Sequence, residues 1–162
     1  MRIVEEKIYL FPELGDKAKE KARDWWREVD CYPYHDENIK AIKAFCNHFN
    51  ITLQDWAIGG RGEFLKTNAE NTHFRGFTLA QAKQLEDKGY FPESGTWLDN
   101  ALIHSFYEDF KKTGSALYAF NQALETALIK INQDIDYHYS DECIDEMLTI
   151  NDYEFTENGK RY

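Results

Sequence analysis

Apolar residues recur at every third or fourth position over long parts of this chain. That spacing places them along one side of a helix, whose period is about 3.6 residues. Asp16, Asp36, Thr78 and Ser140 each stand before such a segment and can accept hydrogen bonds from the free amides of a helix start. We therefore predict helices over residues 16–30, 36–49, 78–88, 96–113, 115–139 and 140–150.

Other segments carry the alternation and the β-branched and aromatic residues that are typical of strands. A strand is predicted over about Ile3 to Tyr9, and a hairpin over residues 51–67 around the Gly59–Gly62 turn. The closing DYEFTENGKRY predicts a strand, an Asn-Gly turn and a short return. We expect an α+β fold, a helix-rich single domain over residues 1–162. Its N-terminal, central-hairpin and C-terminal strands are expected to share one small antiparallel sheet.

Length and composition indicate a globular protein of the cytosol. The chain has 162 residues, of which 43% are hydrophobic and 15% aromatic. No apolar run approaches the roughly 20 residues that cross a bilayer, and the opening MRIVEEKIYLF lacks the order of a secretion signal. We expect a cytoplasmic protein that binds no membrane.

Negative charge is concentrated near the end of the chain. The net charge is −10, and residues 131–162 hold nine acidic residues against two basic ones. Such a chain is repelled by a phosphate backbone, so direct nucleic-acid binding is disfavoured and a basic protein surface is attracted. We expect the partner to be a host protein or nucleoprotein complex with a basic surface.

The segment SDECIDEM is the candidate binding surface within that acidic stretch. Helical spacing puts Ile144, Met147 and Leu148 on one side and the acidic residues on the remaining arc. The acidic arc is either a partner-binding face or a solvated helix face. The candidate contacts are the acids Asp134, Asp136, Asp141, Glu142, Asp145 and Glu146, with Trp26 and Tyr34 as aromatic anchors.

The choice of Trp26 depends on its neighbour. Trp25 and Trp26 are adjacent and therefore about 100° apart around a helix, so both cannot occupy the centre of one narrow apolar stripe. One of them is expected at the edge of the core or outside it. Exposed aromatic residues are frequent anchors of interfaces, and a place at the core margin is the alternative.

No motif supplies a complete catalytic or metal-binding set. The GGRGEF segment lacks the Lys-Ser/Thr of a phosphate-binding loop and runs toward a second strand, so we interpret it as a hairpin turn. Asp55 and Glu63 flank that turn and are the one candidate acid/base pair. We therefore expect no catalytic residue and no cofactor, and interpret the chain as a binding protein instead of an enzyme.

The cysteines and histidines give no recognisable zinc pattern. Cys31, His35, Cys46 and His48 follow the spacing C-x3-H-x10-C-x-H, which differs from that of zinc fingers. Together with Cys143 the three cysteines are odd in number, which fits reduced thiols better than disulfides. We expect no bound metal.

Both ends of the chain resemble a group of small phage- and prophage-encoded cytoplasmic proteins. The shared pattern is an aromatic strand, an F-x-E-L turn, an AK-x-KA helix and a final YEFTE-x-GK. It is carried here by Tyr153–Lys160 and by Tyr9, Phe11, Glu13, Leu14, Ala18, Lys19, Lys21 and Ala22. The resemblance does not extend to residues 35–135. It implies a phage setting, in which small acidic proteins are often inhibitors of bacterial defence.

These observations lead to three hypotheses. The first is an anti-defence protein, similar in action to an anti-CRISPR, that docks an acidic face on a basic nucleic-acid-binding surface. The second is an antitoxin-like or regulatory interaction module, which would also have a basic partner. The third is an enzyme acting on a nucleotide, which predicts a deep pocket around Gly59–Glu63.

Overall fold

The computed structural model describes residues 7–60 and 62–162 and is a helix-rich α+β structure, as predicted. The strands are β1 (Ile8–Leu10), β2 (Leu53–Ala57), β3 (Phe64–Thr67) and β4 (Glu154–Thr156). The helices are α1 (Asp16–Val29), α2 (His35–His48), α3 (Leu79–Lys88), α4 (Trp97–Thr113), α5 (Ala116–His138) and α6 (Asp141–Ile150). Short 3-10 helices cover Phe11–Glu13 and Asn71–Phe74. The part of the predicted first strand before Lys7 lies outside the described residues.

The chain divides into two compact units. The terminal unit combines residues 1–32 with residues 135–162, and the central unit is residues 33–134. The prediction of a single domain stays a prediction. None of the helices in the described residues has both the length and the apolar character needed to cross a membrane.

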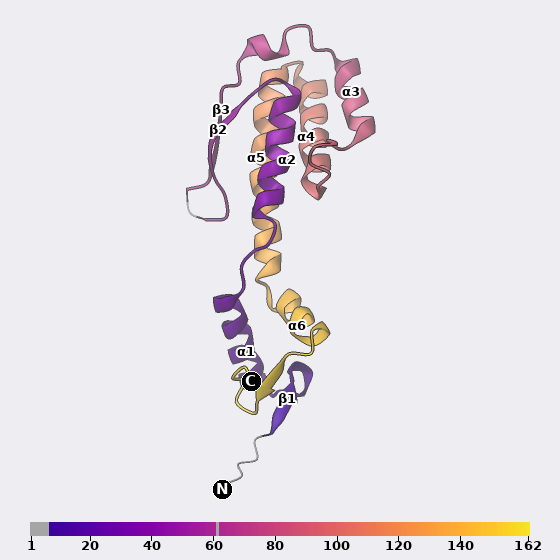
Figure 1. Cartoon of the computed structure of the whole chain (residues 1–162). Coiled ribbons are helices and arrows are strands. Elements are labelled where there is room, and N and C mark those ends of the chain that lie inside the picture. The colour runs from indigo at the N-terminus through magenta and orange to yellow at the C-terminus, as the bar shows by residue number, and fades with distance from the viewer. Residues whose placement is uncertain (1–6, 61) are drawn as a thin grey trace. The chain divides into compact units, whose positions relative to one another are not determined.

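The predicted strands form two sheets instead of one (Figure 1). In the terminal unit β1 pairs antiparallel with β4, with Tyr9 opposite Phe155, so the two ends of the chain meet as expected. In the central unit β2 pairs antiparallel with β3 in a separate two-stranded sheet, with Trp56 opposite Leu65. The expectation of one shared sheet was wrong. A hairpin closes its own ladder through a short turn and needs no partner from distant sequence.

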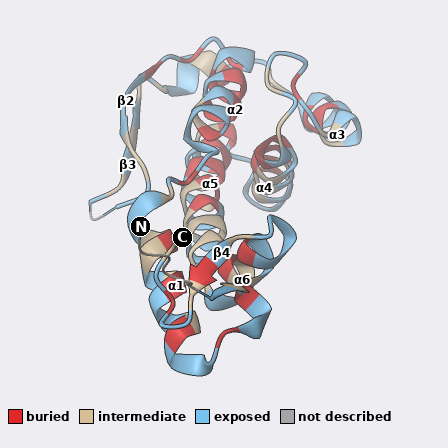
Figure 2. Cartoon of the chain, turned by 60° about the horizontal axis from the view of Figure 1, so that its bottom comes forward, coloured by how far each residue is buried: buried red, intermediate tan, exposed pale blue. Residues whose placement is uncertain are grey.

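Aromatic and aliphatic residues from both chain ends form the core of the terminal unit, and the buried positions of α1, α6 and β4 are red in Figure 2. Phe155 on β4 is fully buried, and its ring meets those of Phe11 and Trp25 edge-on at 6.3 and 6.0 Å between centroids. Ile144 and Leu148 on α6 are fully buried in the same cluster. Burying a side chain of this size contributes about 1.5–3 kcal/mol.

The central unit is built on α2, α4 and α5, with the β2–β3 hairpin on one side of α2 and α3 beside α4 (Figure 1). Phe45 on α2 is fully buried and stacks on Phe120 of α5 at 5.1 Å between ring centroids. Its edges meet Phe49 at 5.5 Å and Phe106 of α4 at 6.0 Å. This cluster of rings fixes α2, whose outer side then faces solvent.

Candidate functional site

Two of the predicted contact acids on α6 form ion pairs with arginines of α1. Arg23 donates to both carboxylate oxygens of Asp145, from Nε at 2.6 Å and from a terminal nitrogen at 2.7 Å. Asp141 lies 3.4 Å from Arg23 and also pairs with Arg27. The missing bases of the acidic segment are therefore supplied by a helix more than a hundred residues away in sequence.

These pairs are part of the packing of α1 on α6. The side chain of Arg23 is only 17% exposed, and its hydrogen bond to Asp145 raises its already high pKa, so the guanidinium stays charged. Two-pronged arginine–carboxylate pairs are stronger and more directional than simple ion pairs. Asp141 and Asp145 therefore have a structural role within the terminal unit, in addition to any role toward a partner.

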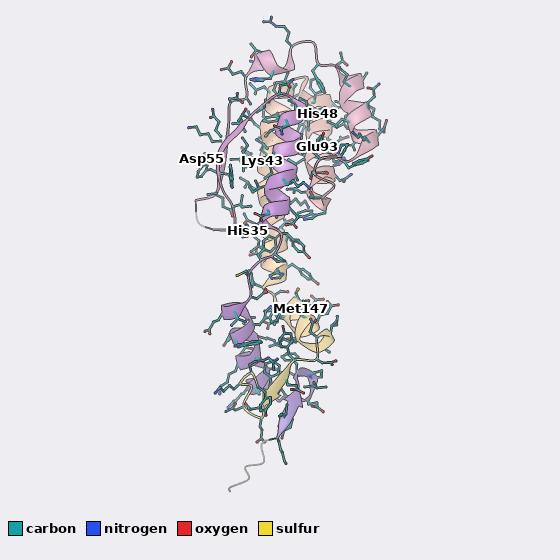
Figure 3. The ribbon with its side chains drawn as sticks, in the orientation of Figure 1. His35, Lys43, His48, Asp55, Glu93 and Met147 are labelled. Atoms are coloured by element: carbon teal, nitrogen blue, oxygen red, sulfur yellow. The ribbon has the colours of Figure 1, made fainter. Side chains whose placement is uncertain are left out.

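The remaining surface of α6 combines acidic and apolar side chains. Glu142 and Glu146 are exposed and form no ion pair among the described residues. Beside them on α6, the side chains of Met147 (labelled in Figure 3) and Ile150 are also exposed. The negative charge of Glu142 raises the pKa of the exposed Tyr137, which places that phenol next to the acids. We call Tyr137, Glu142, Glu146, Met147 and Ile150 the α6 face.

The other predicted contacts are distributed differently. Asp136 is exposed near the end of α5 in the terminal unit. Asp134 and Tyr34 belong to the central unit, so they are not part of the α6 face. Tyr34 is 48% exposed.

The prediction that Trp26 is an exposed anchor was wrong. Trp26 is 7% exposed and packs edge-on against Tyr153 at 5.5 Å between ring centroids. Trp25, its neighbour, is half-buried and contacts Tyr153 at 5.7 Å, and the Arg161 guanidinium lies 5.9 Å from its ring centroid. Tyr153, just before β4, and Phe155 within it widen the apolar surface that α1 can cover, so both tryptophans belong to one broad core.

The backbone amides of the glycine-rich turn are hydrogen-bonded to a side chain of the same hairpin, that of Glu63. Glu63 accepts hydrogen bonds from the backbone amides of Gly59 at 2.7 Å and Gly60 at 3.1 Å, and its other oxygen accepts one from Asn132. The pKa of Glu63 is lowered overall. Partial desolvation by itself would raise this pKa, but the hydrogen bonds from Asn132, Gly60 and Gly59 lower it by more. Amides that would otherwise be available to a phosphate are thus bound to an internal carboxylate.

Glu63→Gln should therefore destabilise the central unit near neutral pH more than in acid. The folded state holds the pKa of Glu63 below its ordinary value of 4.5, so the carboxylate contributes stability above that value. The contribution is lost as the pH falls through the lower, folded-state pKa. Urea unfolding at a series of pH values measures the difference between the two proteins, which should narrow as the pH falls below about 4.

Asp55→Asn is the matched control, because Asp55 is an exposed carboxylate on the same hairpin that accepts one bond, from the amide of Trp56. A gap between wild type and Glu63→Gln that stays constant down to low pH would contradict this account.

Asp55 and Glu63 have separate interactions. Asp55 lies opposite Lys66 in the β2–β3 register, whereas the oxygens of Glu63 are bonded to the turn and to Asn132. No contact joins the two carboxylates among the hydrogen bonds of the described residues. The geometry gives no support to an acid/base pair here.

The candidate zinc ligands include a buried thiol. Cys46 is fully buried in the core beside Phe45, and this desolvation raises the pKa of its thiol to about 12. Cys31 is exposed in the terminal unit. Across residues 7–60 and 62–162, no group of three or more His, Cys, Asp or Glu side chains is arranged to hold a metal ion.

A second surface, on the outer side of α2, was not found from the sequence. Lys40, Lys43 and Asn47 recur at helical spacing there, and they line a hollow of about 390 Å³ together with Trp56 of β2 and Glu93 of the loop before α4. The Lys43 ammonium lies 4.7 Å from the centroid of the Trp56 ring. The polar stripe on α2 was the available signal, but its distance from Trp56 and Glu93 could not be read from the chain.

No family model, curated protein or solved structure gives a significant match to this chain.

Proposed function

We propose that this chain is a phage-encoded anti-defence protein that acts by binding, as anti-CRISPR proteins do. It docks the α6 face on a basic, nucleic-acid-binding surface of a host complex in the cytoplasm, and it does so stoichiometrically and without catalysis. The proposal combines the resemblance of the chain ends to phage proteins with the chemistry of the terminal unit.

The observation that carries the proposal is the mixed character of the α6 face. Glu142 and Glu146 remain unpaired among the described residues while Tyr137, Met147 and Ile150 stand exposed beside them. Met147 and Ile150 are neighbours at i,i+3 spacing on α6, and exposed apolar neighbours beside unpaired acids are more typical of an interface than of a solvated helix face. Apolar side chains at the centre of an interface contribute affinity, and the flanking acids steer and orient a basic partner.

Charge distribution supports the same unit as the binding unit. The terminal unit, residues 1–32 and 135–162, holds 16 acidic and 9 basic residues, whereas the larger central unit holds 13 and 10. The smaller unit therefore carries a net charge of −7. That charge would attract a positively charged nucleic-acid channel over long range.

The resemblance to phage proteins falls on this unit as well. Its pattern residues Phe11, Leu14, Ala18, Ala22 and Phe155 are all buried in the terminal core. These core positions of the pattern support a shared fold of the terminal unit, on whose surface each protein can present its own binding face. The chain's central unit would be the variable part.

Affinity capture from a bacterial host with active defence systems tests the proposal. We expect the protein to retain a nuclease or other nucleoprotein complex, to release it at raised salt, and to compete with the nucleic acid that the complex binds. Retention of a lone small basic protein would favour the antitoxin-like alternative. Failure to retain any basic partner, or retention that nucleic acid does not oppose, would contradict the proposed function.

A further inference from the structure

The hollow beside α2 is continuous with a second one along the same helix. The first is lined by Lys40, Lys43 and Trp56, and the second, of about 260 Å³, is lined by His48 and Phe91. Both share Ala44, Asn47 and Glu93 as lining residues. We call this surface the α2 groove; all of its residues lie in the central unit (Figure 3).

The loop wall of the groove is rigidly held. The carboxylate of Asp99 is fully buried and accepts hydrogen bonds from the backbone amides of Phe91 at 3.1 Å and Thr96 at 3.3 Å. Glu93 lies between these two anchored positions. On the helix wall, the ring of His48 packs edge-on against Phe49 at 4.9 Å between centroids, which fixes the far end of the groove. The backbone of the loop wall is therefore held in place before a ligand binds.

The central chemistry of the groove is a cation beside an exposed aromatic ring. Trp56 is 39% exposed, and Lys43 covers part of its ring at 4.7 Å from the centroid. An anionic group next to Lys43 and Lys40 would draw the ammonium toward itself and free the indole face for stacking. A ligand that has a flat ring and an anion close together matches this arrangement.

The acidic residues restrict the ligand further. Asp36 lines the hollow from the first turn of α2, and Glu93 lines it beside Asn47. Their carboxylates would repel an extended polyphosphate, so a single compact anion fits better. Glu93 and the amide of Asn47 can accept hydrogen bonds from an amino group on the ring.

We infer that the α2 groove binds a nucleoside monophosphate whose base carries an amino group. The base stacks on Trp56, its amino edge faces Glu93 and Asn47, and the phosphate faces Lys40 and Lys43. A cavity of about 390 Å³ is in the size range of small-molecule sites. This inference concerns the central unit and does not rest on the binding role of the α6 face.

Isothermal titration of the full chain with GMP, UMP, guanosine and inorganic phosphate tests the inference. GMP should bind measurably, and guanosine and phosphate alone should each bind at least about tenfold more weakly, since each lacks half of the recognised groups. UMP, whose base has no amino group, should bind more weakly than GMP. Absence of GMP binding, or equal affinity for phosphate alone, would overturn the inference.

Variants locate the binding. Trp56→Ala should weaken GMP binding at least about tenfold, as expected for loss of one base–aromatic stack. Trp97→Ala is the matched control, because Trp97 is 45% exposed on α4 of the same unit and does not line the groove; its affinity should be unchanged. If Trp56→Ala does not fold, Lys40→Glu with Lys43→Glu on the outer side of α2 replaces it, with the same expected loss. Unchanged affinity in the folded groove variant would contradict the site.

Discussion

Gly159→Ala is expected to destabilise the terminal unit by about 3 kcal/mol or more. Gly159 has a φ of +82°, which a residue with a side chain adopts only with strain. A methyl group there would also overlap the carbonyl oxygen of Ala18 on α1 and come within 2.8 Å of its carbonyl carbon. Backbone cannot move aside as a flexible side chain can, so the C-terminal hairpin would lose its place on α1.

Hydrogen exchange followed by mass spectrometry measures this effect unit by unit. Gly159→Ala should speed exchange in peptides from α1 and the C-terminal hairpin and leave the core of the central unit unchanged. Gly76→Ala is the matched control, because Gly76 has a φ of +76° but open space around the missing methyl group. If each variant caused the same small loss of protection from hydrogen exchange in its own unit, the proposed clash with Ala18 would be wrong.

This result would bear on how the proposed resemblance of the chain ends to phage proteins is interpreted. Gly159 of the closing motif then serves to seat the hairpin on α1, as the buried Phe155 of the same motif does. Motif residues with structural roles describe a fold. The surface of α6, which is outside the motif, is free to carry a function of its own.

Local chemistry allowed much of the secondary structure to be predicted. Thr78 accepts a hydrogen bond from the Gln81 amide at the start of α3, and Gly89 and Gly114 end α3 and α4 with φ values of +70°. Ser140 caps α6 through the amide of Cys143. These signals lie within a few residues of the element they bound, so the chain itself contains them.

The composition of the candidate site depended on contacts that the sequence does not contain. The acidic segment contains no Lys or Arg of its own, yet Arg23 and Arg27 of α1 pair with Asp145 and Asp141. Helical spacing showed that Trp25 and Trp26 diverge, but not that Tyr153, from the distant C-terminal segment, would contact the rings of both. Long-range packing decided both questions.

Replacing both glutamates of the α6 face with lysine is expected to weaken partner binding by about a hundredfold or more. Each reversal puts a positive charge against a basic surface, and like charges brought together across an interface cost several kcal/mol. A cost of about 2.8 kcal/mol already corresponds to a hundredfold higher dissociation constant. Glu142 and Glu146 suit this test because they support no ion pair among the described residues. Asp141 and Asp145 do not, since their reversal would disrupt α1–α6 packing.

The control for net charge is Glu28→Lys with Glu157→Lys. Both residues are exposed acids of the terminal unit that lie off α6, and neither forms an ion pair within the described residues. The change in charge is the same in both double variants. A purely long-range attraction would therefore weaken binding equally in the two.

The most direct measurement is the dissociation constant of the captured host complex for wild type, Glu142→Lys/Glu146→Lys and Glu28→Lys/Glu157→Lys at one salt concentration. We expect a loss of about a hundredfold for the α6 pair and only a few-fold for the control pair. Equal losses in the two variants, or wild-type affinity in the α6 pair, would contradict the claim that this face is the docking surface.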